Sequence, residues 1–322
     1  MRGQPIFNRL ALIGMGLIGS SIARAARAQG AARSIVATAR SAATRRRLAE
    51  LGLADHVVET NAAAAEGADL VIVAIPVGAC GEVAAEIGPH LAPGAIVSDV
   101  GSVKGTVLRA MSPHLPAGVH FVPAHPVAGT ENSGPDAGFA ELFVNRWCIL
   151  TPPSSVEPAA VERLAAFWRL LGANVEIMSA EHHDLVLGIT SHLPHLIAYT
   201  IVGTAEEFST VSRSEVLKFS AGGFRDFTRI AASDPTMWRD VFLHNKDAVL
   251  EMLAQFSEDL AKLTRAMRRG DGATLFDHFT RTRAIRRGIV QIGQDSAAPD
   301  FGRPHPAKDM SPLPRPYAAD NE

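Results

Sequence analysis

Three glycines near the start of the chain have the spacing of a site that binds a dinucleotide. Gly14, Gly16 and Gly19 form a GxGxxG sequence that follows an apolar run, Arg9–Ile13, and opens a stretch of small residues. In this context the glycines permit a tight turn, a close approach of a pyrophosphate to the backbone, and close packing of helix on strand. Free N–H groups at the start of the helix would hold the phosphates. The residues predicted to line this cofactor site are Gly14, Gly16, Leu17, Ile18, Gly19, Arg40, Ser41, Ile75 and Pro76.

The end of the second predicted strand bears on which dinucleotide binds. Enzymes that use NAD carry an acidic residue about 20 residues after the glycines, where it accepts hydrogen bonds from the ribose. No Asp or Glu occurs between Gly14 and Glu50, and the strand ends at Arg40 and Ser41. A guanidinium and a hydroxyl can pair with a 2′-phosphate, so this pattern favours NADP. NAD remains the alternative, with Arg40 stacked on adenine and the arginines that follow forming a solvated helix face.

Further polar segments could hold a substrate or move a proton. The first two, DVGSVKG at 99–105 and HPVAGTE at 125–131, follow predicted parallel strands, and doubly wound sheets bind ligands at the carboxyl ends of their strands. The others, SHLPH at 191–195 and GGFRDFTR at 222–229, lie in the second half of the chain.

The elements that must position these residues change character midway along the chain. Short apolar runs alternate with helix-like stretches up to about residue 178, which predicts a parallel sheet covered on both faces. The runs at 120–123 and 148–151 are expected to continue that sheet. From about 180 to 293 apolar residues recur at helical spacing. The expected helices are 186–208, 213–219, 234–269 and 272–292.

These patterns predict three segments. Residues 1–178 form a dinucleotide-binding domain, residues 179–293 a helical domain, and residues 294–322, rich in proline and without periodicity, a disordered tail. The long helix at 234–269 is expected to pack against a second subunit.

Composition narrows the class of protein. The chain has 322 residues, 47% of them hydrophobic, and a net charge of −2. A chain with this net charge lacks the excess of basic residues that is typical of a nucleic-acid binder. No stretch reaches the roughly 20 apolar residues of a membrane helix, and the N-terminus has no long apolar signal region. Two cysteines, Cys80 and Cys148, do not make a disulfide framework. We therefore expect a cytoplasmic protein that contacts neither membrane nor nucleic acid.

The motifs together resemble those of the prephenate/arogenate (cyclohexadienyl) dehydrogenases of tyrosine biosynthesis. The resemblance covers about residues 9–292 and is carried by HPVAGTENSG, SHLPH and GGFRDFTRIAASDPTMWRD, in that order behind GxGxxG. It implies an α/β fold, with an N-terminal Rossmann doubly wound sheet followed by an all-α dimerisation domain, and therefore a homodimer. It also implies oxidative decarboxylation of prephenate to 4-hydroxyphenylpyruvate, or of arogenate to tyrosine, with hydride transfer to NAD(P).

The same resemblance implies roles for individual residues. His125 would be the base that takes the hydroxyl proton, a task that suits an imidazole near neutral pKa. Ser102 would hydrogen-bond His125 and the substrate hydroxyl, and Arg229 would grip the ring carboxylate with its forked guanidinium. The remaining substrate-binding residues would be His195, Ser191, His192 and Thr130.

Other interpretations of the sequence stay open. The histidines at 182, 183, 192 and 195 invite a metal site, but no cysteine accompanies them, and we expect no metal. A β-hydroxyacid dehydrogenase or imine reductase would share the two-domain layout. A sensor that binds NADPH without turnover would keep the glycines but could lose His125, Ser102 or Arg229. The choice between prephenate and arogenate is not evident from any residue.

Overall fold

The N-terminal half is built on a six-stranded parallel sheet. The computed structural model describes residues 4–130, 132–207 and 222–291. The strands are β1 (Phe7–Ile13), β2 (Ala32–Thr38), β3 (His56–Val57), β4 (Leu70–Val73), β5 (Ile96–Asp99) and β6 (His120–Phe121). Their spatial order is β3-β2-β1-β4-β5-β6, and every pairing is parallel. This is the strand order of a doubly wound dinucleotide-binding sheet, as the sequence predicted.

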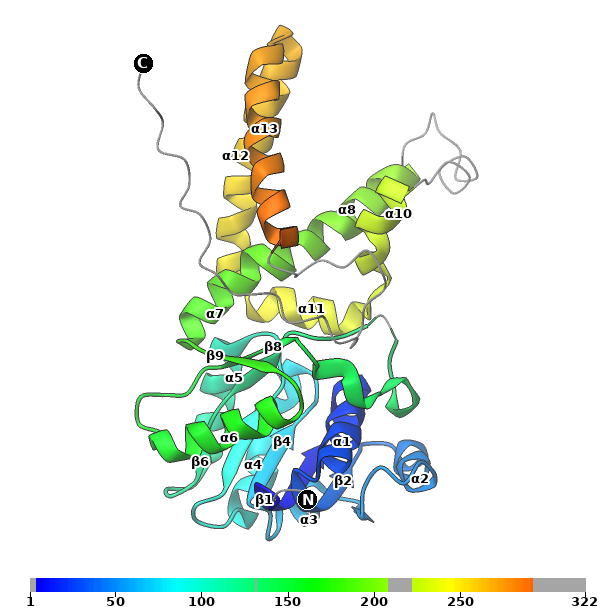
Figure 1. Ribbon diagram of the computed structural model, residues 1–322, viewed down its shortest axis with the longest axis vertical. Helices are drawn as coiled ribbons and strands as arrows, with labels where there is room; N and C mark the ends of the chain where they lie inside the picture. Colours follow the sequence, from blue (N-terminus) through cyan, green and yellow to red (C-terminus); the bar gives the residue numbers. More distant parts are fainter. Residues whose placement is uncertain (1–3, 131, 208–221, 292–322) are drawn as a thin grey trace.

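Helices cover both faces of this sheet because its strands are apolar on both sides (Figure 1). On β1, Leu10 and Leu12 belong to one buried cluster, whereas Ala11 and Ile13 belong to another. The first cluster includes residues from α1 (Leu17–Gln29), α2 (Ala42–Glu50) and α6 (Pro158–Leu170). The second includes residues from α3 (Asn61–Ala65), α4 (Cys80–Ile87) and α5 (Lys104–Met111). The alternation of side chains along a strand thus gives each face its own core.

The run expected at 120–123 continues the parallel sheet as β6, whereas the run expected at 148–151 lies in a second sheet, so the second of these two predictions was wrong. β7 (Ala124–Pro126), β8 (Trp147–Leu150) and β9 (Asn174–Ile177) make a three-stranded sheet in which β7 and β8 are antiparallel. The chain follows β5 as far as Val122, whose N–H donates to Val97. Pro123 has no N–H to continue the ladder, and Ala124 pairs with Leu150. β7, which carries His125, therefore begins a new sheet at the corner of the old one.

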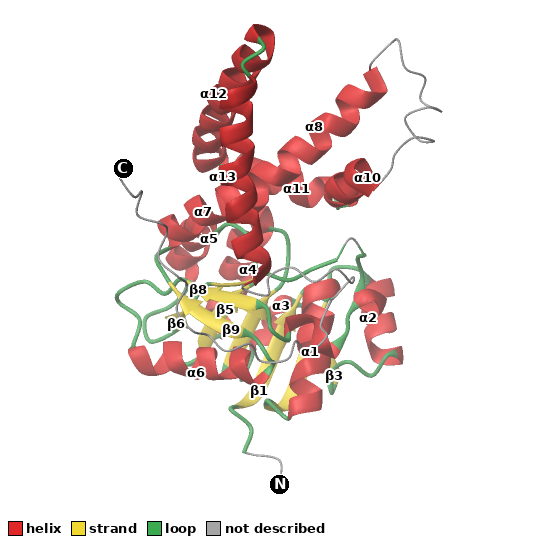
Figure 2. Ribbon diagram, turned by 45° about the horizontal axis from the view of Figure 1, so that its top comes forward, coloured by secondary structure: helices red, strands yellow, loops and turns green. Residues whose placement is uncertain are grey.

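The C-terminal half is helical and projects away from the sheet (Figure 2). Its elements are α7 (Ala180–Leu187), a π-helical turn (Gly188–His192), α8 (Leu193–Glu207), α10 (Gly222–Thr228), a 3₁₀ turn (Arg229–Ala232), α11 (Pro235–His244), α12 (Lys246–Arg269) and α13 (Gly272–Gln291). The helix expected at 213–219 and the tail at 294–322 lie outside the described residues.

The single helix expected at 234–269 is broken. α11 ends at His244 and α12 begins at Lys246, with Asn245 at φ −113° and ψ 28° between them. The side chain of Asn245 is buried and donates a hydrogen bond to the carbonyl of Asp184 on α7, which holds the break in place. The apolar pattern continues through the break, so periodicity alone could not reveal it.

The stretch Ala180–Glu207 is long and apolar enough, by length and composition alone, to cross a membrane, with a mean hydropathy of 1.5 in its most apolar window. The expectation that no stretch approaches that length was therefore too strict. The same stretch carries His183 and His192, both fully buried and hydrogen-bonded to other protein groups. In this protein 28% of that window is buried, and Ile189, Ile201 and Val202 are among the exposed apolar side chains of the stretch.

Candidate active site

The glycine loop between β1 and α1 leaves room for a ligand where the motif requires it. Gly14 has φ +91°, and a Cβ there would lie 2.3 Å from the carbonyl oxygen of Ala74. A Cβ on Gly19 would lie 2.1 Å from the oxygen of Gly14. At Gly16, by contrast, a Cβ would meet none of the described atoms within 4 Å. Protein packing thus requires glycine at the first and third positions. The second glycine faces open space, which leaves room for a pyrophosphate to approach the backbone.

The start of α1 is open in the same way. Its N-cap is Gly16, which makes no capping hydrogen bond from a side chain, and its first turn has no acidic residue. The positive end of the helix dipole and the first N–H groups are therefore available to an anion. Ile75 packs against the Gly14 turn, close to the place a Cβ would take. These features fit a dinucleotide held across Gly14–Gly19, with Ile75 beside it.

The loop after β2 presents a cation rather than a carboxylate. Arg40 is exposed, and over the described ranges it makes no hydrogen bond or ion pair through its side chain. Ser41 accepts a hydrogen bond from Thr44 N at 2.9 Å and caps α2. Arg45 donates to the carbonyls of Ala39 and Arg40 at 2.8 and 3.1 Å, so it braces the loop and is not simply solvated.

His125 lies at the junction of the two halves, with its ring held by the helical half. It is 8% exposed on β7, and its Nδ1 lies 2.9 Å from Nε2 of His183 on α7. Nδ1 of His183 lies 2.8 Å from Oδ1 of Asp184. Burial, with the neighbouring His183 and Lys104, lowers the pKa of His125 well below 6.5. The ring is therefore neutral at physiological pH and able to accept a proton.

Among the described residues no hydrogen bond joins Ser102 to His125, whose Nδ1 lies against His183. Ser102 is half-buried in the segment between β5 and α5. Its main chain lies close enough to the ring of His192 to raise the pKa of that histidine. Ser102 is thus beside the histidine cluster but is not an established partner of the base.

A buried ion pair forms the floor beneath His125. Lys104 and Asp99, both fully buried, are in direct contact, and Lys104 Nζ also donates to the carbonyl of Ala124 at 2.7 Å. Asp99 in turn accepts from the N–H of Gly101 at 2.7 Å. The pair therefore joins the end of β5 to the start of β7, immediately before His125.

His192 occupies the middle of the cluster. Its Nδ1 lies 3.0 Å from Asn245 Nδ2, whose other hydrogen bond goes to the carbonyl of Asp184 at 2.9 Å. Burial lowers the pKa of His192 to about 4. Its Nε2 is buried and has no hydrogen-bond partner among the described residues.

His195 and Arg229 complete the cluster on the helical side. The His195 ring stacks on Trp238, with centroids 3.6 Å apart, and its Nδ1 lies 2.8 Å from the carbonyl oxygen of Ser191. Burial lowers the pKa of His195, and the nearby positive charge of Arg229 lowers it further. The guanidinium of Arg229 is thus within electrostatic reach of His195, at the exposed end of the site.

Thr130 follows β7 in the sequence, five residues after His125. It is half-buried in the loop that follows β7, and its hydroxyl oxygen accepts from the N–H of Asn132 at 3.2 Å. Among the described residues no hydrogen bond joins Thr130 to the histidines. Its place in a substrate pocket stays a prediction.

The sequence interpretation missed three groups that hold the cluster. The sequence suggests His183 only as a metal ligand, does not single out Asp184, and places Asn245 inside a helix. Within the described ranges no set of three or more His, Cys, Asp or Glu side chains is placed to hold a metal ion. The adjacent His183 and Asp184, four and five residues after the N-cap Ser179, were the only signal in the sequence, and it is a weak one.

The fold and the cluster together define a class, the dehydrogenases that use a nicotinamide dinucleotide. In this protein a neutral buried histidine lies beside a doubly wound sheet with an open glycine loop. Comparisons with known proteins identify the family within this class of dehydrogenases. Residues 22–177 match the family model for the prephenate dehydrogenase nucleotide-binding domain, and residues 179–281 match that for the prephenate dehydrogenase dimerization domain. The chain therefore belongs to the prephenate dehydrogenase family.

Individual relatives agree with this assignment. The chain is 44% identical to a cyclohexadienyl dehydrogenase from Zymomonas mobilis over 89% of its own length and 97% of the relative's. It is 34% identical to a prephenate dehydrogenase from Bacillus subtilis, over 90% of this chain and 78% of that one. Among solved structures, prephenate dehydrogenase from Aquifex aeolicus, in complex with hydroxyphenyl propionate and NAD+, is similar with a TM-score of 0.81 and 32% identity, covering 88% and 98% of the two chains.

Proposed function

We propose that the protein oxidatively decarboxylates prephenate, arogenate or both, in tyrosine biosynthesis. The observation that carries this is the position of His125, a neutral buried imidazole between the nucleotide-binding sheet and the helical half. Family membership supports it, and gives no support to a hydroxyacid dehydrogenase or a sensor without turnover. The reaction needs a base for the substrate hydroxyl, a hydride acceptor, and a cation for the ring carboxylate.

The residues of the site supply these needs in part. His125 takes the hydroxyl proton as the ring carbonyl develops, which is typically worth about 10²–10⁴ in rate. Arg229, at the exposed end of the cluster, binds the ring carboxylate, and His195, Ser191 and His192 lie between the two. The chemistry that a nicotinamide dinucleotide supplies when bound is acceptance of the hydride. Loss of CO2 then follows because it makes the ring aromatic.

A four-way assay tests this function. Prephenate and arogenate are each combined with NADP and with NAD, and initial rates are followed by the absorbance of the reduced nicotinamide. We expect turnover with at least one substrate and a higher kcat/KM with NADP than with NAD. Absence of reduced cofactor in all four combinations would remove the proposed function.

The preference for NADP is proposed from the loop after β2. Between Gly14 and Glu50 there is no carboxylate to accept from a ribose hydroxyl, and Arg40 stands exposed where a 2′-phosphate would lie. We expect Arg40→Asp to weaken NADP binding by roughly tenfold or more, because a charge-assisted contact is replaced by repulsion. NAD binding should change little.

Fluorescence titration with each cofactor measures this effect, and Arg46→Asp on the neighbouring helix α2 serves as the matched control. An Arg40→Asp variant with an unchanged ratio of NADP to NAD affinity would contradict the account of 2′-phosphate recognition.

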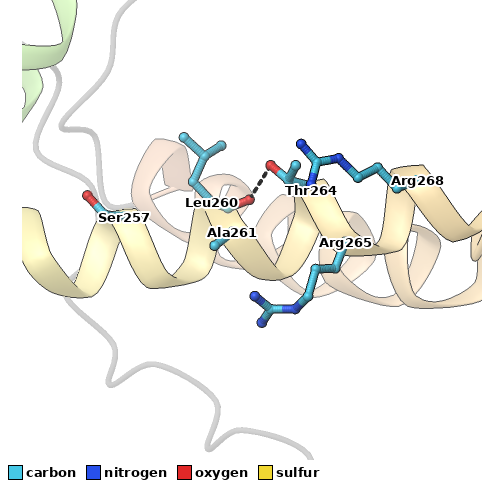
Figure 3. A pocket seen from close by; sticks show the side chains of 6 residues that line it. All are labelled: Ser257, Leu260, Ala261, Thr264, Arg265 and Arg268. Atoms are coloured by element: carbon cyan, nitrogen blue, oxygen red, sulfur yellow. Dashed lines mark hydrogen bonds between the residues drawn. The ribbon is translucent and has the colours of Figure 1, made fainter.

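A homodimer through the helical half is proposed from its exposed apolar side chains. Phe276 on α13 is 70% exposed and Leu260 on α12 is 50% exposed. Figure 3 shows Leu260 beside Ala261 on α12, with Thr264, Arg265 and Arg268 further along the same helix. An apolar surface of this kind is typical of a subunit interface, and the family's domain in this region is described as a dimerization domain. Light scattering should give twice the 34.2 kDa of one chain, and the monomer mass at micromolar concentration would argue against the dimer.

A cytoplasmic location is part of the same proposal. Both cysteines are free and buried, with no disulfide between them, which suits a reducing compartment. Fractionation of cells expressing the protein would test this, and recovery in the membrane fraction would contradict it.

A further inference from the structure

We propose that His183 and Asp184 form a proton relay with His125, in which the helical half sets the tautomer of the base and takes its second proton. This inference rests on the proposed function and assigns positioning roles to two residues of α7. The hydrogen bonds join Asp184 Oδ1 to His183 Nδ1 at 2.8 Å and His183 Nε2 to His125 Nδ1 at 2.9 Å. The order of these two hydrogen bonds determines which nitrogen of each histidine carries hydrogen.

The starting point is the charge of Asp184. Burial alone would raise its pKa, but hydrogen bonds from His183 and from the N–H groups of Lys104 and Gly105 hold that pKa below its usual value. These N–H groups lie 2.7 and 2.9 Å from the two carboxylate oxygens. Asp184 is therefore an ionised acceptor at neutral pH, and it can bond to His183 only if Nδ1 of His183 carries hydrogen.

The tautomers of both histidines follow from this constraint. Burial lowers the pKa of His183, so its ring is neutral, and with hydrogen on Nδ1 its Nε2 is an acceptor. The 2.9 Å contact then requires His125 to donate from Nδ1. A neutral His125 with hydrogen on Nδ1 has a bare lone pair on Nε2. That atom is bonded to no other residue in the described part of the chain, which leaves it for the substrate hydroxyl.

The proton balance of the reaction is complete with this relay. The substrate O–H bond breaks and its proton binds Nε2 of His125. At the same time the ring carbon that bears this oxygen gives up its hydride to oxidised NAD(P). The bond between the ring and its carboxylate then breaks. CO2 leaves, and the electron pair of that bond completes the aromatic ring. As Nε2 of His125 gains a proton, Nδ1 passes its own proton to Nε2 of His183, and the positive charge comes to lie beside the Asp184 carboxylate.

The charges around the relay favour this displacement. Lys104 on α5 lowers the pKa of both histidines, and His192 on the π-helical turn lowers that of His125. Asp184, and more weakly Asp99 on β5, raise the pKa of His183. A positive charge is thus better placed on His183 than on His125, one ring closer to the carboxylate.

Three variants separate the relay from a merely structural contact. His183→Leu removes the acceptor for Nδ1 of His125, and we expect kcat to fall on the order of 10²-fold, because the ring can turn its lone pair away from substrate. His183→Gln offers a carbonyl oxygen that accepts from Nδ1 but cannot take the proton, and kcat should fall only about tenfold. His182→Gln, at the exposed neighbour on the same helix, is the control and should match wild type. KM for the substrate and cofactor affinity should stay within about twofold of wild type in all three.

The pH profile of kcat gives a readout that a structural role would not move. In the wild type, the proton that switches off the base as pH falls resides on His183, where Asp184 stabilises it. In His183→Gln it must bind His125, which is buried beside Lys104 and remote from that carboxylate. The acid limb should therefore shift to lower pH in His183→Gln and stay in place in His182→Gln.

A measurement without substrate keeps this inference distinct from the proposed function. Imidazole ¹⁵N NMR of the full-length protein, assigned with His125→Asn and His183→Gln, should show hydrogen on Nδ1 and none on Nε2 for both histidines. If wild type turns over no substrate, the proposed function fails, whereas the NMR spectrum still decides the tautomers. Hydrogen on Nε2 of His125 in the free enzyme would overturn the relay, as would an active wild type whose kcat and acid limb are both unchanged by His183→Gln.

Discussion

Replacing His125 with asparagine is expected to lower kcat by about 10²–10⁴-fold, the usual contribution of a general base. Asparagine can place an N–H close to where Nδ1 lies now, so the hydrogen bond to His183 Nε2 can persist. It has no basic lone pair for the substrate hydroxyl. The substitution therefore removes the proton acceptor with little disturbance of the surrounding contacts, and cofactor affinity should remain near that of wild type.

The control for this experiment is His120→Asn on β6. His120 lies five residues earlier in the same segment and faces Glu157 at 4.0 Å, outside the histidine cluster. Steady-state kinetics of the two variants, with cofactor titrations, give the comparison. A His125→Asn enzyme that keeps wild-type kcat would exclude His125 as the base and remove the proposed mechanism.

The pH dependence of the wild-type enzyme follows from the same geometry. Burial lowers the pKa of His125 well below 6.5. A depressed pKa means that the ring stays unprotonated, and competent as a base, from neutral pH down through mildly acidic pH. Burial also lowers the pKa of His183, where the relay places the extra proton, so activity should be lost only as pH falls below 6.5 through the depressed pKa of this hydrogen-bonded pair.

The nucleotide-binding half was predictable because its signals are local. The GxGxxG loop, the flanking strand and the small-residue helix all lie within about twenty residues, and each requires the others. The structure shows the reason for the glycines directly, since a Cβ on Gly14 or Gly19 would collide with main-chain atoms. The sequence could not show that Pro123 ends the parallel pairing, because the new partner of Ala124, Leu150, comes 26 residues later.

The helical half was less predictable because side chains from distant elements shape it. Asn245 interrupts a continuous apolar pattern to reach Asp184 and His192, which lie 61 and 53 residues earlier in the chain. His183 is 58 residues from His125, its partner. Motifs indicated His125, His192 and His195 as a group, and the structure brings them together. The contacts that orient them are pairwise and long-range, and a single sequence has no signal for such pairs.

The buried ion pair beneath His125 leads to the second large effect, on stability. Lys104→Met should lower the free energy of unfolding by about 3–5 kcal/mol, the range found when one partner of a buried pair is removed. Methionine fills much of the lysine's volume, so the loss comes from the Asp99 carboxylate, left fully buried without its cation, and from the unpaired carbonyl of Ala124. Lys262→Met on α12 is the matched control, because Lys262 pairs with Asp259 at the surface and such pairs contribute about 0–1 kcal/mol.

A second substitution identifies the cause of that loss. Asp99→Asn in the Lys104→Met background removes the unpaired charge but keeps an oxygen that can accept from the N–H of Gly101. Part of the lost stability should therefore return in the double variant, as judged by urea unfolding of the full chain. Because Lys104 also fixes the start of β7, kcat of the folded Lys104→Met enzyme should fall as well, through a displaced His125. A Lys104→Met variant no less stable than Lys262→Met would show that the pair does not hold β5 to β7, and the position of His125 would then need another explanation.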